Sequence, residues 1–127
     1  MATKDAVFAL RDLLSAVPGV ASCKVGFEAD ISPADWPIVR IVSDTETPGR
    51  PYGEATMGAT IYFGMPIASA EGLEAVYEAL LDLRDAITEA LRGTELRWRQ
   101  IVYDSDRITT YKLAAISIEL PVVSASA

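Results

Sequence analysis

The chain has 127 residues, of which half are hydrophobic and 23% are charged, and its formal net charge is −7. Size and composition are those of one folded globule, so we expect a single domain over residues 1–127 with a frayed tail at 121–127. The acidic balance argues against nonspecific nucleic-acid binding, because that binding requires a basic surface that displaces counterions from phosphates.

The chain contains no histidine and one cysteine, Cys23. Zinc sites and histidine-based catalytic triads therefore cannot be built, and an internal disulfide cannot form. We expect no enzyme activity, no cofactor and no metal site, and a small core or sheet role for Cys23. The first residues lack the apolar stretch of a signal peptide and no run approaches a membrane span, so we expect no membrane partner.

An amphipathic helix is predicted over residues 4–17, where apolar residues recur with helical period until Pro18 and Gly19 stop it. Short strands are predicted over 22–27 and 37–43. Residues 44–54 contain two prolines and two glycines and are predicted to form an exposed loop. The later elements are a strand over 55–65, a helix over 70–92, and a hairpin of strands over 95–103 and 108–120 that ends at Pro121.

This order, α-β-β-β-α-β-β, predicts an α+β fold in which two helices pack on one mainly antiparallel sheet. Alternation in the strands supports it. Met57, Ala59, Ile61 and Phe63 should share one face of the 55–65 strand, because successive strand residues point to opposite faces.

The predicted helix over 70–92 carries carboxylates spaced by three or four residues, within an arc of roughly 80° on a helix that turns about 100° per residue. The opposite side is apolar, from Val76 through Leu80 to Leu91. Like charges at i,i+4 cost a few tenths of a kcal/mol each, so the pattern has a cost. One interpretation is a solvated face. The other is a face that lines a channel or meets a basic partner. The carboxylates are Glu71, Glu74, Glu78, Asp82, Asp85 and Glu89.

Several further residues are candidates for interfaces. Trp36 and Tyr52 are aromatic residues where the chain is expected to be exposed, and such residues either anchor protein interfaces or cap the edge of the core. Arg50 lies near Tyr52 in the predicted loop. Arg97 and Arg99 flank Trp98 on a predicted strand, which suits an exposed strand face, ion pairs with a neighbouring subunit, or stacking on a single strand of nucleic acid.

The pair Asp104 and Asp106 could contribute to a cation site, but a cation cage needs more than two oxygen ligands. Aspartates are also the usual residues of tight turns, and we interpret the pair as part of the turn between the last two strands.

The whole chain resembles the tail terminator (tail completion) proteins of long-tailed bacteriophages. The likeness lies in Ala-Val-Phe-Ala-Leu-Arg-Asp-Leu-Leu at 6–14, in Trp-Pro-Ile-Val-Arg-Ile-Val at 36–42, in the long acidic second helix, and in Tyr-Lys-Leu-Ala-Ala-Ile-Ser-Ile-Glu-Leu at 111–120. The likeness is one of element order, size and residue pattern over nearly all of the chain, without a signature motif.

The resemblance implies a non-enzymatic virion protein, made in the bacterial host cytoplasm, that forms a hexameric ring on the tail tube, stops its growth and joins tail to head. Its implied partners are further copies of itself, the tail tube protein and a head-completion or connector protein, with DNA only passing through and not specifically bound. The acidic helix face would then supply a negative lumen or a partner surface.

Two other classes remain open. A head-completion or tail-tube component would differ in forming continuous stacks instead of closed rings. A small ligand-binding or enzymatic α+β domain would need a deep pocket with a carboxylate of raised pKa.

Overall fold

The fold consists of two long helices and one sheet, seen in a computed structural model that describes residues 3–26, 33–48, 54–66, 73–94, 96–103 and 111–123. The element order confirms the predicted α-β-β-β-α-β-β arrangement, with one short 3-10 helix added before the second strand. The elements are α1 (Thr3–Ser15), β1 (Ser22–Val25), η1 (Pro33–Asp35), β2 (Ile38–Pro48), β3 (Glu54–Pro66), α2 (Leu73–Arg92), β4 (Arg97–Tyr103) and β5 (Tyr111–Val123).

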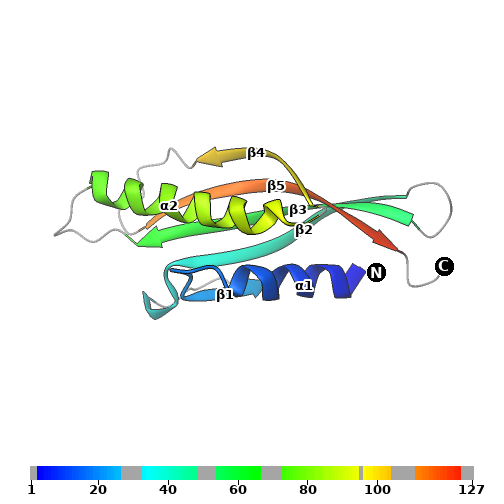
Figure 1. The fold of residues 1–127 in the computed structure, drawn as a ribbon, viewed down its shortest axis with the longest axis horizontal. Helices are drawn as coiled ribbons and strands as arrows, with labels where there is room; N and C mark the ends of the chain where they lie inside the picture. The colour runs from blue at the N-terminus through cyan, green and yellow to red at the C-terminus, as the bar shows by residue number, and fades with distance from the viewer. Residues whose placement is uncertain are drawn as a thin grey trace.

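The sheet has five strands in the order β1-β2-β3-β5-β4 (Figure 1). β1 pairs with β2 in parallel, and the other three pairings are antiparallel, which confirms the mainly antiparallel sheet. The two edges of the sheet are therefore different strands. One edge is the short parallel strand β1 and the other is the antiparallel strand β4.

Both helices contribute to one hydrophobic core on one face of the sheet. α1 packs mainly on β1 and β2 and also reaches β5, whereas α2 packs over β3 and β5 (Figure 1). The predicted alternation is confirmed, since Met57, Ala59, Ile61 and Phe63 all lie in this core, at no more than 2% exposure. None of the helices among the described residues is long and apolar enough to cross a membrane.

The prediction of an exposed loop over residues 44–54 is wrong for most of its length. β2 continues to Pro48 and β3 begins at Glu54, with Pro48 opposite Ala55 in the ladder. β2 pairs with β1 only as far as Ile41, so its outer side is an edge beyond that point, where a proline removes no ladder bond. Backbone pairing with β3 thus overrides the local turn composition. The loop candidates Arg50 and Tyr52 lie outside the described residues.

The prediction that Pro121 ends the last strand is also wrong, because β5 runs to Val123 and Pro121 lies opposite Thr56 of β3. The physical reason is the same. β4 begins at Arg97, opposite Glu119, so one side of β5 has no partner strand beyond that residue. β2, β3 and β5 consequently extend together past the ends of the two helices (Figure 1).

Candidate interaction surfaces

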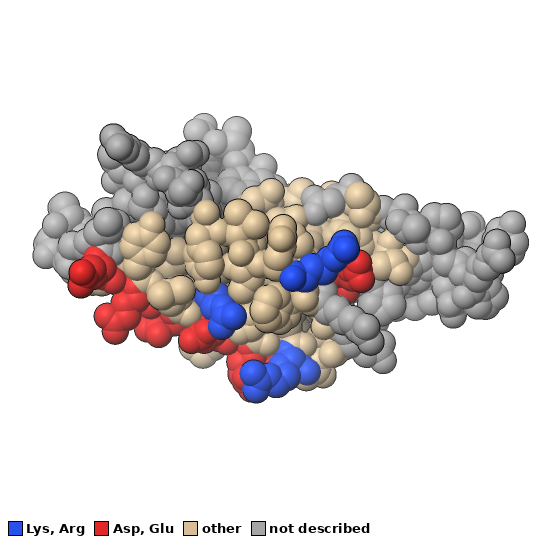
Figure 2. Space-filling model, turned by 90° about the horizontal axis from the view of Figure 1, so that it is seen from above, with Lys and Arg blue, Asp and Glu red and all other residues tan. Residues whose placement is uncertain are grey.

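The acidic stripe of α2 is exposed along its described length. Asp82 and the other described carboxylates of the stripe all lie on the solvent side of α2. Leu80 and Ile87, on the opposite side, are buried at 1% and 0% exposure. The predicted geometry is therefore confirmed for the described members, and Glu71 lies outside them. Figure 2 shows acidic side chains gathered along one border of the molecule. The described members of the acidic stripe are Glu74, Glu78, Asp82, Asp85 and Glu89.

Two members of the stripe pair with arginines of the same helix. Asp85 accepts from Arg84 at 2.6 Å, and Glu89 lies 3.1 Å from Arg92. Exposed pairs of this kind contribute about 0–1 kcal/mol. No ion pair among the described residues involves Glu74, Glu78 or Asp82, so the N-terminal half of the stripe keeps its negative charge uncompensated.

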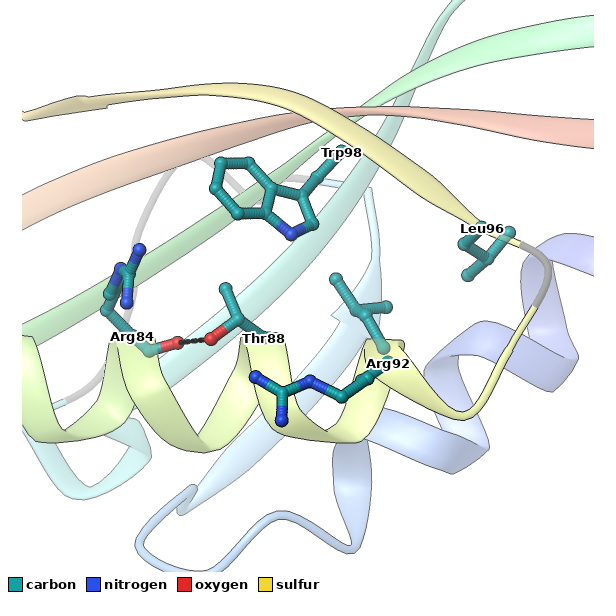
Figure 3. A pocket seen from close by; sticks show the side chains of 6 residues that line it. Arg84, Thr88, Arg92, Leu96 and Trp98 are labelled. Carbon is teal, nitrogen blue, oxygen red and sulfur yellow. Dashed lines mark hydrogen bonds between the residues drawn. The ribbon is translucent and has the colours of Figure 1, made fainter.

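A cleft of about 450 Å³ lies between α2 and β4. The Trp98 ring enters it from β4, while Arg84, Thr88 and Arg92 enter it from α2 (Figure 3). Arg84 lies over the Trp98 ring at 5.9 Å from its centroid. The hydrogen bond to Asp85 raises the pKa of the Arg84 guanidinium. Both cleft arginines lie beside carboxylates, Asp85 and Glu89, so a small anion bound to them would also meet negative charge.

The sequence reasoning missed this cleft. A signal was present, because Leu81, Arg84 and Thr88 lie on a flank of α2 between the acidic and the apolar sides. Nothing in the sequence, however, shows that β4 is the strand beside that flank. The sheet order brings β4 there, and the sheet order is a tertiary property.

β4 carries large apolar side chains at the edge of the sheet. Trp98, Val102 and Tyr103 are 43%, 54% and 39% exposed, and Leu81 on the adjoining flank of α2 is 45% exposed. Free edges are normally shielded by charge, proline or a bulge, since their unpaired backbone groups recruit other strands. β4 has a bulge between Trp98 and Gln100, but none is found along Ile101 to Tyr103.

The predicted interface residues of this strand behave differently from one another. Arg99 is exposed and pairs with Glu119 of the neighbouring strand at 3.3 Å, within the same chain. Arg97 begins β4, and its side chain lies outside the described residues. Trp98 pairs in register with the buried Ile118 and so points to the helix face.

Trp36 lies at the other edge of the sheet, half-buried beside β1. Three hydrogen bonds tie the chain there to the start of β1. Ala21 N–H and Ser22 N–H donate to the Pro37 carbonyl at 2.9 and 3.4 Å, and Ser22 Oγ donates to the Asp35 carbonyl at 2.9 Å. Trp36 and Arg99 are therefore not brought together. The two candidates belong to opposite edges of the sheet.

Cys23 has the structural character expected of it. It is half-buried against the core, and its thiol donates to the Arg11 carbonyl at 3.5 Å. Burial raises the pKa of this thiol, which disfavours the reactive thiolate. Within the described ranges, no three His, Cys, Asp or Glu side chains are grouped as metal ligands. The pair Asp104 and Asp106 lies outside them.

The whole fold is similar to that of a chain in a solved structure titled "Virion of native gene transfer agent (GTA) particle". The TM-score is 0.59 and the sequence identity is 14%, and the match covers 97% of this chain and 96% of that chain. At this identity the likeness is one of fold. Neither a family model nor a curated protein matches the sequence.

Proposed function

We propose that this protein is a structural subunit of a phage-like particle, and that it acts as a tail terminator. In this role a ring of copies caps the tail tube, stops its growth and joins the tail to the head. The observation that carries the proposal is the match of the complete fold, over 97% of this chain, to a chain of a gene transfer agent virion. The sequence resemblance to tail terminators adds the specific role.

The described surface supports assembly better than catalysis. The sheet ends in a free edge with exposed aromatic and aliphatic side chains, which is a usual feature of protein interfaces. The one cysteine is held as a neutral thiol by burial, and the chain has no histidine. The cleft beside α2 has its arginines already paired, so a small-molecule ligand is the weaker alternative.

We further propose that the acidic stripe of α2 is a partner-facing or DNA-repelling surface of the ring. Glu78 and Asp82 lie one helical turn apart and have no ion-pair partner among the described residues. Like charges so placed are unfavourable, so their presence is more consistent with a function outside the subunit than with its stability.

The proposal is tested by adding the purified protein to growing tail tubes of the same particle. A terminator limits tube length and is seen by electron microscopy as a single ring at one end. Continuous stacks along the tube would instead identify a tube component. Binding only to the isolated head connector would identify a head-completion protein, and failure to bind any particle component would contradict the structural role.

A further inference from the structure

Among the described residues, the helix layer is incomplete over β4. α1 covers β1 and β2, and α2 covers β3 and β5, so the side of β4 that faces the helix layer is left partly open. The cleft beside α2 lies at this opening and is lined by Trp98, and Tyr103 is exposed farther along the same strand. We call this surface the slot, and define it by Leu81, Arg84, Thr88, Trp98 and Tyr103.

The opposite edge of the molecule has a helix with an outward flank. Cys23 of β1 donates to the Arg11 carbonyl, which places that side of α1 next to the β1 edge and away from α2. Phe8 lies one turn before Arg11 on this flank, is 37% exposed, and has the Arg11 guanidinium over its ring at 4.6 Å. We call Lys4, Phe8 and Arg11 the α1 flank.

The directions of the edge strands suit each other. β1 runs parallel to β2, and each following step across the sheet is antiparallel, so β4 runs opposite to β1. When one copy is placed beside another with the same orientation, β4 of the first meets β1 of the second in an antiparallel pair, the more favourable arrangement. The same placement brings the α1 flank of the second copy over the slot of the first.

Charge favours this head-to-tail arrangement over the pairing of two identical edges. α2 carries five carboxylates against two arginines, a net −3, whereas α1 is neutral and β1 adds Lys24. If β4 paired with β4 of another copy, the two acidic α2 helices would lie on the same side of the dimer, or each would lie against the slot of the other copy. Pairing β4 with β1 instead places the neutral α1, in which Arg11 pairs with Asp12 of the same helix, and Lys24 of β1 beside the acidic α2 of the next copy, so that two acidic helices are kept apart.

We infer that the occupant of the slot is a second copy of this chain, seated by its α1 flank and its β1 edge. This inference rests on the proposed ring and names the surfaces that form it. The two surfaces are different, so the contact is heterologous and repeats around a closed ring. Phe8 inserts beside Trp98 and Tyr103, while β4 and β1 extend one sheet across the junction.

The inference is tested with two variants that each damage one surface. Trp98→Glu damages the slot and Phe8→Glu damages the α1 flank, so either change should weaken assembly at least about 30-fold, as loss of an interface anchor does. Thr56→Glu, at an exposed position of β3 outside both surfaces, is the matched control. Circular dichroism and thermal melting check that each variant is folded. If Trp98→Glu does not fold, Tyr103→Glu replaces it, because Tyr103 is exposed in the slot and pairs with Ala114 on the same face of the sheet as Trp98.

Mixing the two variants gives the decisive result. Each variant alone should be monomeric. In the mixture, the intact slot of the Phe8→Glu variant can bind the intact α1 flank of the Trp98→Glu variant. Native mass spectrometry should therefore show a 1:1 heterodimer that grows no further. If the wild type forms rings and both variants form rings equally well, the inference is overturned but the proposed function still stands. A wild-type dimer sensitive only to Trp98→Glu would overturn it in favour of β4–β4 pairing. A wild type that stays monomeric even on tail tubes would overturn both.

Discussion

The guanidinium of Arg40 donates from Nη1 to the Ser22 hydroxyl at 3.0 Å and to the Ser22 carbonyl at 3.1 Å. One fully buried cation of β2 thereby holds β1, the shortest strand of the sheet, whose pairing with β2 is the one parallel pairing among the described strands. A third bond runs to the Val39 carbonyl at 2.9 Å. The edge that we assign to the subunit contact thus depends on a residue in the second strand.

Replacement of Arg40 by alanine should lower the free energy of unfolding by about 2–4 kcal/mol, because it removes charge-assisted hydrogen bonds and leaves a cavity. Ser22→Ala should cost about 1–3 kcal/mol, since it removes the hydroxyl that accepts from Arg40 and donates to the Asp35 carbonyl. Chemical denaturation measures both, and a double variant whose effects simply add would show that the Arg40–Ser22 contact does not couple the strands.

Two adjacent leucines of α2 provide a direct test of the helix orientation. Leu80 is 1% exposed and belongs to the core, whereas Leu81 is 45% exposed on the slot side. Leu80→Ala should cost about 2–5 kcal/mol through lost burial and a cavity, and Leu81→Ala less than about 1 kcal/mol. Equal losses in thermal or denaturant unfolding would contradict the placement of α2.

Gly58 is required by its neighbour across the ladder. It lies opposite Thr45, and a Cβ added at Gly58 would come within 2.5 Å of the Thr45 hydroxyl. Gly58→Ala should therefore destabilise the protein by about 1–3 kcal/mol, the usual cost of overpacking. Thr45→Ala removes that hydroxyl, so the double variant should recover most of the loss. Persistence of the full loss in the double variant would indicate a backbone cause.

Cys23 should make stability decline in alkali. Burial raises the pKa of its thiol in the folded protein, so the folded state holds the proton more tightly than the unfolded state. The contribution is complete below the unfolded pKa of about 8.5 and is lost as pH rises above it. Wild type should consequently lose more stability than Cys23→Ala between neutral pH and pH 10. Parallel curves for the two proteins would contradict the burial of this thiol.

Local periodicity was sufficient to predict most of the fold. The acidic and apolar sides of α2 and the alternating faces of β3 follow directly from 3.6- and 2-residue repeats, and both are confirmed. The errors at Pro48 and Pro121 share one cause. Proline was interpreted as the end of a strand, yet both prolines lie where one side of the strand has no partner, and this cannot be known before the sheet order is known.

The candidate surfaces were only partly predictable for the same reason. Trp36 and Arg99 were grouped as one class of interface residue, but the sheet places them at opposite edges. The cleft that joins Arg84 to Trp98 depends on β4 lying outside β5, a consequence of strand order that no local pattern records. Residue types led us to expect an interface, whereas our proposal that it has two different halves depends on the order of the strands in the sheet.

The proposed junction also determines which layer of the ring faces outward. Two helices side by side need about 20 Å of circumference per copy, and five strands about 24 Å. The layer nearer the ring axis has a radius smaller by about 10 Å and therefore a shorter circumference. The helix layer can be this inner layer only in rings of more than about fifteen copies, because a smaller ring leaves too little circumference per copy for two helices. In a smaller ring the sheet lines the lumen through its other face, which includes Thr60, Tyr62 and Ser117, and the acidic stripe lies outside.

The last prediction therefore concerns Asp82 in the middle of the stripe. In a Cys23→Ala background, Asp82→Cys labelled with a bulky maleimide should give extra density on the outer rim of the ring in electron micrographs. Density in the lumen would contradict the edge-to-edge junction.

Changing Glu78 and Asp82 to lysine moves their charge from −2 to +2 per copy, and it should leave folding and ring formation intact because both residues are exposed. Positions 78 and 82 still repel each other in this variant, but their pairs with Glu74 and Asp85 become pairs of opposite charge, so α2 should not be destabilised. Glu78→Gln with Asp82→Asn separates loss of negative charge from gain of positive charge. If DNA passage fails only in the lysine variant while rings and tube capping persist, the stripe faces the DNA, and if capping fails, it faces a basic partner on the outside, which is the result we expect.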